Sequence, residues 1–339
     1  MRAWYHTKFG GPAVAQLGEL PEPELRDAQD VIIKVHAVAL NPMDYKRRQG
    51  AMKFILGEKW PHVLGYDVSG VVVSCGAQAK KFRPGEQVYC MLPHDGAGAL
   101  AEVVAVHESY VAHKPENLTH VQAAAIPMVF LTAILAFRAG HLTEDKRVFV
   151  TGGAGGVGSA AIQVAKRMFK ASNIATTAAS KKADKLKSLG ADVVIDHHMT
   201  NFESELHEFD FSLDCTGEAK KCIECVTKQG TVVSITETPS PDVLHEQAGR
   251  GVRISRFVGM VLDCLSYSVA KKARRNDVNY KYFFVAGQGE VLEEIRPLFE
   301  SKQLVPVIDR TFQFEKADAA MEYLEAGHAT GKVVVEVVK

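Results

Sequence analysis

The fold of this chain is decided by the stretch Thr151-Gly152-Gly153-Ala154-Gly155-Gly156-Val157-Gly158. The stretch follows an apolar run at 147–150 and opens a segment, 157–170, with the composition of a helix. A strand, a glycine-rich turn and a helix in this order form the context that a dinucleotide-binding fingerprint requires. Glycine weakens regular structure, so such a density of glycines indicates a function for the turn.

Three of these glycines fall in the register G-x-G-x-x-G, namely Gly153, Gly155 and Gly158. The first permits a tight turn, the second lets the backbone approach a pyrophosphate, and the third lets helix and strand pack closely. Gly156 and Val157 would open the helix, whose unpaired N–H groups and partial positive charge attract phosphates. The alternative is a glycine-rich loop without a ligand, which the flanking strand and helix disfavour.

Bulk properties exclude several classes of protein. The chain has 339 residues, no net charge, 24% charged residues and 47% hydrophobic residues, which suits two globular domains. A neutral protein has no general electrostatic attraction to nucleic acid or to acidic membranes, so we expect neither as a partner. The most apolar stretch, 121–139, is interrupted by polar residues and by a proline. Residues 1–6 lack a secretory leader, so we expect a cytoplasmic protein.

The pattern of apolar and polar residues changes near residue 121. Before it, short apolar runs such as 31–35 and 68–73 are separated by proline and glycine, which is typical of a barrel-like β domain. After it, helix-like and strand-like segments alternate, which favours a parallel sheet with helices on both faces. The expected helices and strands cover 121–139, 147–151, 157–170, 173–177, 181–189, 193–195, 209–214, 218–228, 231–235, 281–285 and 290–299.

Two further features have plain explanations. Cys222 and Cys225 are spaced as a redox pair or half a zinc site, but no second half follows them. We expect both to be buried, reduced thiols on one helix face, and we expect no disulfide framework. The basic cluster at 271–275 is expected to be the solvated face of a helix.

A set of phrases runs from one end of the chain to the other. They are Leu40-Asn41-Pro42-Met43-Asp44-Tyr45, Gly65-Tyr66-Asp67-Val68-Ser69-Gly70-Val71-Val72, and the stretches 82–88, 123–127, 131–133, 155–166, 189–192, 214–217 and 331–334. In this order and spacing the phrases resemble the medium-chain dehydrogenase/reductase superfamily, specifically its zinc-free quinone oxidoreductase (zeta-crystallin-like) branch.

The resemblance implies an α/β architecture of two domains. A GroES-like β-barrel domain would comprise 1–122 and 288–339, and an inserted Rossmann domain with a doubly wound parallel sheet would comprise 123–287. Cofactor and substrate would share the cleft between the domains. Members usually form homodimers through the edge strand of the Rossmann sheet, here 281–285, and an apolar edge of that kind favours pairing.

The cofactor is expected to be NADPH. Enzymes that bind NAD usually carry Asp or Glu at the end of the second strand, to hold the ribose 2′-OH. Here the residues around the end of that strand include Thr177, Ser180 and Lys181, and the first carboxylate after the strand is that of Asp184. Hydroxyl and ammonium groups would bind a 2′-phosphate, which a carboxylate would repel. Alternatively, Lys181 is a solvated residue of a first helical turn.

No metal is expected. The zinc alcohol dehydrogenases of the superfamily use a Cys in the stretch that here reads 41–44, which contains none, and a Gly-His-Glu that here reads Gly65-Tyr66-Asp67. The structural zinc lobe is also absent, because no cysteine lies between Cys90 and Cys215. Zinc needs three or four converging ligands.

Without a Lewis acid, a conjugated acceptor is the easier substrate, so we expect reduction of quinones or other conjugated carbonyls. By resemblance, Asn41 faces the nicotinamide, and Tyr45 lies beyond it as a proton donor or an aromatic wall. Thr132 would lie close to the nicotinamide, or simply bond to its own helix. Thr216 and Gly217 would approach the nicotinamide ribose. The alternative functions are a 2-enoyl thioester or alkenal reductase and a non-catalytic NADP(H)-binding protein.

Overall fold

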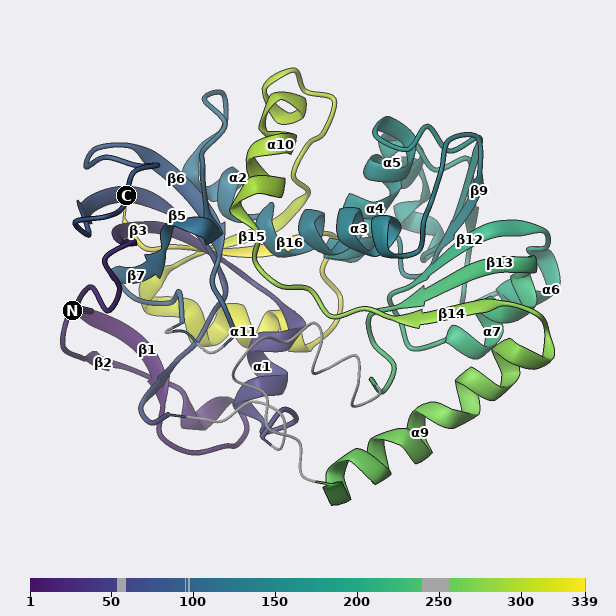
Figure 1. Cartoon of the computed structure of the whole chain (residues 1–339), viewed down its shortest axis with the longest axis horizontal. Coiled ribbons are helices and arrows are strands. Elements are labelled where there is room, and N and C mark those ends of the chain that lie inside the picture. The colour runs from purple at the N-terminus through teal and green to yellow at the C-terminus, as the bar shows by residue number, and fades with distance from the viewer. Residues whose placement is uncertain (54–58, 95, 97, 240–255, 339) are drawn as a thin grey trace. The chain divides into compact units, whose positions relative to one another are not determined.

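The computed structural model describes residues 1–53, 59–94, 96, 98–239 and 256–338 (Figure 1). The chain divides into two units, of which the first comprises Met1–Leu131 and Ala286–Lys339 and the second comprises Thr132–Val285. The first unit thus contains both ends of the chain, and the second is inserted into it.

The first unit is built around the strand β3 (Asp30–Leu40), whose residues are almost all buried. β3 pairs antiparallel with β5 (Asp67–Cys75), β7 (Val103–His107) and β16 (Lys332–Glu336). Its run of Val, Ile and Ala suits a central strand that is covered on both faces. The pairing with β16 shows that the end of the chain completes a sheet begun near its start.

Two sheets make up this unit. The larger has seven strands in the order β15-β16-β3-β5-β6-β8, with β7 beside β3, and the smaller has the order β2-β1-β4. The remaining strands are β1 (Arg2–His6), β2 (Gln16–Glu19), β4 (His62–Val63), β6 (Gln87–Met91), β8 (Val111–His113) and β15 (Ile308–Gln313). The helices are α1 (Pro42–Arg48), α2 (His120–Ala124), α10 (Gly289–Glu300), α11 (Ala317–Glu325) and the short η1 (Pro12–Val14), η2 (Glu108–Tyr110) and η4 (Phe314–Lys316).

The second unit contains a six-stranded parallel sheet in the order β11-β10-β9-β12-β13-β14. Numbered within the unit, this order is 3-2-1-4-5-6, which is that of a doubly wound dinucleotide-binding fold. The strands are β9 (Arg147–Val150), β10 (Asn173–Thr177), β11 (Val193–Ile195), β12 (Phe209–Asp214), β13 (Val226–Ser234) and β14 (Asn279–Tyr282). The predicted parallel sheet is therefore confirmed.

The helices of the second unit alternate with these strands. They are α4 (Gly156–Arg167), α5 (Ala183–Leu189), α6 (Phe202–Glu205), α7 (Ala219–Cys225), α9 (Arg256–Arg275) and the short η3 (Ser180–Lys182), and α3 (Pro127–Ala139) runs across the division between the units. Cys222 and Cys225 lie buried on α7 as free thiols, as predicted. Burial raises the pKa of Cys225 to about 12, so this thiol is protonated at neutral pH.

Three predicted elements are wrong in detail. The helix expected at 218–228 is α7, which ends at Cys225, and residues 226–228 begin the strand β13. The single helix expected at 121–139 is two helices, α2 and α3, because Pro127 has no N–H with which to continue a helix and instead starts α3. The strand expected at 281–285 is β14, which ends earlier at Tyr282. Tyr282 pairs with Ser234, the last residue of β13, so the ladder between these two strands ends there.

Among the described residues, His120–Ala139 is the one helical stretch whose length and composition would suffice to cross a membrane. Its mean hydropathy is 1.8, and 78% of it is buried inside the protein. This degree of burial is also what a core helix of the fold requires.

Candidate functional site

The glycine-rich turn lies where the strand order of the second unit reverses. β9 ends at Val150 between β10 and β12, and the turn leads from there into α4. Gly152 has a φ of +63°, so the left-handed turn falls on this residue. A Cβ on Gly158 would lie 2.2 Å from the carbonyl oxygen of Gly152, so only glycine lets the helix approach the turn this closely.

The N-terminus of α4 is open toward a ligand. Gly155 caps the helix and is exposed, and among the described residues a Cβ there would meet the Gly152 oxygen alone, at 3.3 Å. Within the described part of the chain, the N–H groups of Val157 and Gly158 donate to no hydrogen-bond acceptor. Free N–H groups at a helix N-terminus suit the diphosphate of a dinucleotide, so the residues present fit such a cofactor.

Thr177 holds this turn in place. Its hydroxyl accepts a hydrogen bond from the N–H of Gly152 at 2.9 Å, and its carbonyl accepts one from the N–H of Gly153 at 2.9 Å. Thr177 is buried. Its hydroxyl therefore acts on the glycine turn from the end of β10, a contact that no local feature of the sequence indicates.

Ser180 and Lys181 follow β10 in η3 and are both exposed. The hydroxyl and the N–H of Ser180 both donate to one oxygen of Asp196, which follows β11; the N–H distance is 2.8 Å. In the sequence, the first carboxylate after β10 is that of Asp184. The structure brings one there from the neighbouring strand.

Asp214 organises the loop that carries Thr216 and Gly217. This carboxylate, at the end of β12, is fully buried. One of its oxygens accepts the N–H groups of residues 216, 217 and 218 at 3.0–3.1 Å and the hydroxyl of Thr151 at 3.3 Å, and the other accepts the hydroxyl of Ser234 at 2.8 Å. The loop is thereby fixed beside the glycine turn. An Asp followed by a turn with glycine is the signal that could have found this residue.

A second group of polar residues is buried in the first unit. Asn41 follows β3, Asp67 begins β5 and Lys332 begins β16, and the antiparallel register of these three strands brings them to one edge of the sheet. The ammonium of Lys332 donates to the side-chain oxygen of Asn41 and, at 3.0 Å, to Asp67. The Asn41 amide nitrogen donates to the same oxygen of Asp67 at 2.9 Å.

The cluster is satisfied by its own members. The other oxygen of Asp67 accepts the N–H of Met128 at 2.8 Å, in the first turn of α3. The exposed fractions of Asn41, Asp67 and Lys332 are 2%, 0% and 3%. Both ends of the Asn41 side chain are thus engaged within the protein.

Asp44 lies beside this cluster on α1. One of its oxygens accepts the N–H of Asn41 at 2.6 Å, and the other has no hydrogen-bond partner within the described residues. Burial raises the pKa of Asp44 to about 7, and the charge of Asp67 acts in the same direction. The Asn41 N–H, Lys332 and Arg47 oppose the shift without cancelling it.

The other two predicted catalytic residues are Tyr45 and Thr132. Tyr45 is half-buried on α1 and packs against the hydrophobic core of the first unit. Burial, and then the charge of Glu325, raise the pKa of its phenol, so the hydroxyl remains protonated at neutral pH. Thr132 lies on α3 and is buried, with an exposed fraction of 3%.

The positions at which zinc alcohol dehydrogenases carry His and Glu are occupied here by Tyr66 and Asp67, which accept hydrogen bonds from cationic side chains. Asp67 is committed to an ammonium and an amide, and the phenol of Tyr66 accepts a hydrogen bond from Arg47 at 2.6 Å. A dication would face two cations here, so these residues do not fit a zinc ion. Elsewhere in the described ranges, no three His, Cys, Asp or Glu side chains are grouped so as to hold a metal.

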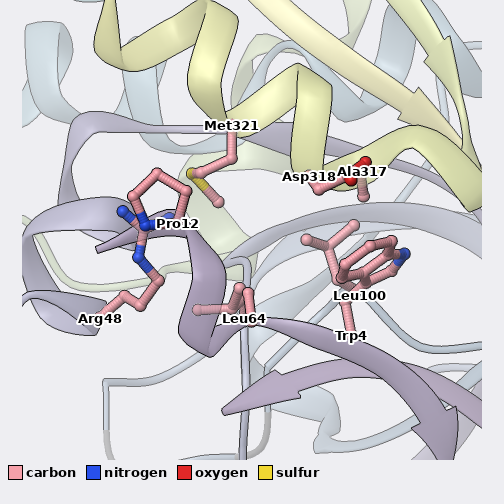
Figure 2. A pocket seen from close by; sticks show the side chains of 9 residues that line it. Trp4, Pro12, Arg48, Leu64, Leu100, Ala317, Asp318 and Met321 are labelled. Atoms are coloured by element: carbon pink, nitrogen blue, oxygen red, sulfur yellow. The ribbon is translucent and has the colours of Figure 1, made fainter. Parts of the chain in front are cut away.

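Two cavities lie among the described residues, one in each unit. Figure 2 shows the first, which lies between Trp4, Arg48 and Leu64 and the α11 side chain Met321; its volume of about 10 Å³ holds a single water at most. The second has about 370 Å³ and lies in the other unit, between Gly217, Glu237 and Val269 of α9. Its size suits a small ligand, and it adjoins the loop that Asp214 organises.

Comparison with known proteins assigns the chain to a family. Residues 27–116 match the alcohol dehydrogenase GroES-like domain, and residues 189–335 match the zinc-binding dehydrogenase domain. The 2-methylene-furan-3-one reductase of Solanum lycopersicum is 38% identical, over 99% of this chain and 79% of its own length. The chain belongs to the medium-chain dehydrogenase/reductase superfamily, in its quinone oxidoreductase branch.

Other members support the assignment. The NADPH-dependent alkenal/one oxidoreductase of Arabidopsis thaliana is 36% identical, over 99% of this chain and 79% of its own. The quinone oxidoreductase of Coxiella burnetii superposes with a TM-score of 0.85 at 30% identity, over 99% of both chains. The Arabidopsis protein is chloroplastic, so the family is not confined to the cytoplasm.

Proposed function

We propose that this protein is an NADPH-dependent oxidoreductase that reduces quinones or other conjugated carbonyl compounds. The observation that carries the proposal is the glycine turn at the reversal of the strand order, followed by a helix whose first N–H groups are free. When bound, NADPH supplies the hydride for the acceptor. Three relatives are named for reactions with an enone, with alkenals and enones, or with a quinone, and these names support the choice of acceptor.

We propose that the reaction proceeds without a metal. At the zinc positions, Asp67 is engaged by the ammonium of Lys332 and Tyr66 by the guanidinium of Arg47, and these two cations would repel a metal ion. A conjugated acceptor requires less polarisation than a simple ketone, because the charge that develops spreads over an enolate or a quinol. Metal analysis of the purified protein tests this proposal, and zinc bound at one equivalent per chain would contradict it.

Individual residues are assigned as follows. Gly153, Gly155, Gly156, Val157 and Gly158 hold the diphosphate with their backbone. Ser180 and Lys181 follow β10, at whose end the adenosine ribose binds. Thr177 holds the glycine turn in place through the hydrogen bond that its hydroxyl accepts from Gly152. Thr216 and Gly217 lie on the loop near the nicotinamide ribose, and Thr132 lies close to the ring.

The roles of Asn41 and Tyr45 differ. Asn41 acts as a positioning residue, because both ends of its amide are engaged by Lys332 and Asp67. Tyr45 is the proposed proton donor, since its phenol remains protonated. A Tyr45→Phe variant should lose turnover at unchanged NADPH affinity. Equal turnover in the variant would leave the ring as an aromatic wall only.

The reaction itself is tested by NADPH oxidation against a panel of 1,2-quinones, 1,4-quinones, short enones and 2-enoyl thioesters, with NADH as the control. Turnover of thioesters or alkenals alone would favour the alternative of a 2-enoyl thioester or alkenal reductase. Tight NADPH binding without turnover of any acceptor would favour a non-catalytic NADP(H)-binding protein.

We further propose a homodimer formed at β14 and α9. β14 is the edge strand of its sheet, and α9, which packs next to it, exposes Met260, Val261, Leu265 and Tyr267. An apolar surface beside an open strand edge favours self-association. Leu265→Glu should yield a monomer in sedimentation, whereas the exposed Met199→Glu should not change the assembly. A wild-type monomer would contradict the proposal.

A cytoplasmic location is proposed on chemical grounds. All six cysteines are free, as is typical of a reducing compartment. Imaging of a tagged protein would test this, and import into an organelle would contradict it.

A further inference from the structure

Asp196 is an ionised carboxylate held between two loops of the second unit. One of its oxygens accepts both the hydroxyl and the N–H of Ser180, and the other accepts the N–H of His198 at 2.9 Å. These contacts, with the Ser180 hydroxyl foremost, lower the pKa of Asp196 to about 2. The charge is therefore present at every physiological pH.

The position of this charge follows from the sheet. β10 and β11 are parallel neighbours, so the residues that follow them meet at one edge, and Thr177 pairs with Ile195 at the last rung. The N–H of Ala178 donates to the carbonyl of Ile195 at 3.0 Å, which ties the two loops together. In a doubly wound fold the adenosine ribose lies at the end of the second strand, which is β10 here.

We propose that Asp196 replaces the carboxylate that the end of β10 lacks: it accepts a hydrogen bond from the ribose 2′-OH of NADH and thereby limits the preference for NADPH. This inference rests on the proposed function of the second unit as a coenzyme-binding domain. A carboxylate offers about four lone-pair directions, and donors from the described residues use three. One direction remains for a ligand, and the residue is only partly buried.

The same carboxylate opposes a 2′-phosphate in two ways. It repels the phosphate charge, and it engages the Ser180 hydroxyl that would otherwise donate to the phosphate. The exposed Lys181 acts in the opposite direction. The chain therefore binds both coenzymes, with a smaller preference for NADPH than its hydroxyl and ammonium groups alone would give.

The test is a titration of the purified full-length protein with NADPH and with NADH, followed by coenzyme fluorescence without any acceptor. Asp196→Asn keeps an oxygen for the N–H of Ser180 and removes the charge. We expect NADPH to bind roughly threefold to tenfold more tightly and NADH roughly threefold to tenfold more weakly, since one charged hydrogen bond is exchanged for one relieved repulsion.

The matched control is Asp192→Asn. Asp192 lies just before β11, at the end of that strand opposite to Asp196, where it accepts the N–H of Ile174 and pairs with Lys166. The substitution Asp192→Asn also removes one carboxylate charge next to β11 and should leave the ratio of the NADPH and NADH affinities unchanged.

Three outcomes would overturn the inference. In the first, Asp196→Asn leaves the ratio of affinities as in the wild type. In the second, it changes both affinities in the same direction, as a purely positional role through Ser180 requires; Ser180→Ala would then reproduce that change. In the third, the wild type binds neither coenzyme, which would also refute the proposed function and is distinguished by the absence of any fluorescence signal.

Discussion

Asp44 makes the stability of the first unit depend on pH in the direction opposite to that of most carboxylates. Burial raises its pKa to about 7, so the folded protein binds this proton more tightly than the unfolded chain does. The stabilisation is fully present below about pH 4 and is lost as the pH rises through 7. Asp44→Asn keeps the acceptor for the Asn41 N–H and removes the titration.

The size of the effect follows from the two pKa values. With a folded pKa of about 7 and an unfolded pKa near 3.9, the wild type loses about 2–3 kcal/mol of unfolding free energy between pH 5 and pH 8 relative to Asp44→Asn. The unfolding free energy of the variant minus that of the wild type should therefore be higher at pH 8 than at pH 5 by about this amount. Other titrating groups are common to both proteins and cancel in the difference.

The assay is urea unfolding at pH 5 and pH 8, followed by tryptophan fluorescence. Both tryptophans of the chain, Trp4 and Trp60, belong to the first unit, so the signal reports on the unit that contains Asp44. Asp318→Asn, at an exposed carboxylate of the same unit, is the control and should show no such gain. An equal difference between wild type and Asp44→Asn at both pH values would refute the reasoning.

The remaining predictions concern the buried cluster and the glycine turn. Lys332→Met leaves the Asp67 charge buried without its cation, so the free energy of unfolding should fall by about 3–5 kcal/mol in the same urea assay. Adding Asp67→Asn should restore part of that loss. A double variant whose loss of stability equals the sum of the two single losses would exclude an interaction between the two residues. Gly158→Ala places a Cβ 2.2 Å from a carbonyl oxygen, so it should lower the melting temperature and abolish NADPH binding. Gly155→Ala meets little inside the protein, so it should keep the melting temperature and weaken NADPH binding alone, and equal losses of stability in both variants would contradict these separate roles.

Much of the second unit could be predicted from the sequence because its signals are local. The apolar runs gave β10, β11 and β12 with their observed bounds, and the glycine turn gave the start of α4 within one residue. Elements that depend on their partners were less accurate. β14 ends where β13 ends, and no feature of the segment 281–285 itself shows this.

The buried cluster of the first unit shows why a site is harder to predict than a fold. Lys332 lies far along the chain from Asn41 and Asp67, and only the antiparallel register of β16 on β3 brings it to them. The sequence contained all three residues within recognised phrases. The pairing of the strands, and with it the engagement of both ends of the Asn41 side chain by Lys332 and Asp67, does not follow from these phrases.

Asp196 and Asp214 show how far burial decides what a carboxylate can do. Asp214 ends β12 and Asp196 directly follows β11, so both lie at the carboxyl ends of strands of one parallel sheet, and both accept backbone N–H groups of the next loop. Asp214 is fully buried and accepts five donors, so its role is confined to ordering the protein. Asp196 is partly exposed and accepts three, which leaves one direction for a ligand. The residue type is the same and both lie where a strand ends, so the number of protein donors and the access of solvent decide which of the two can influence the choice of coenzyme.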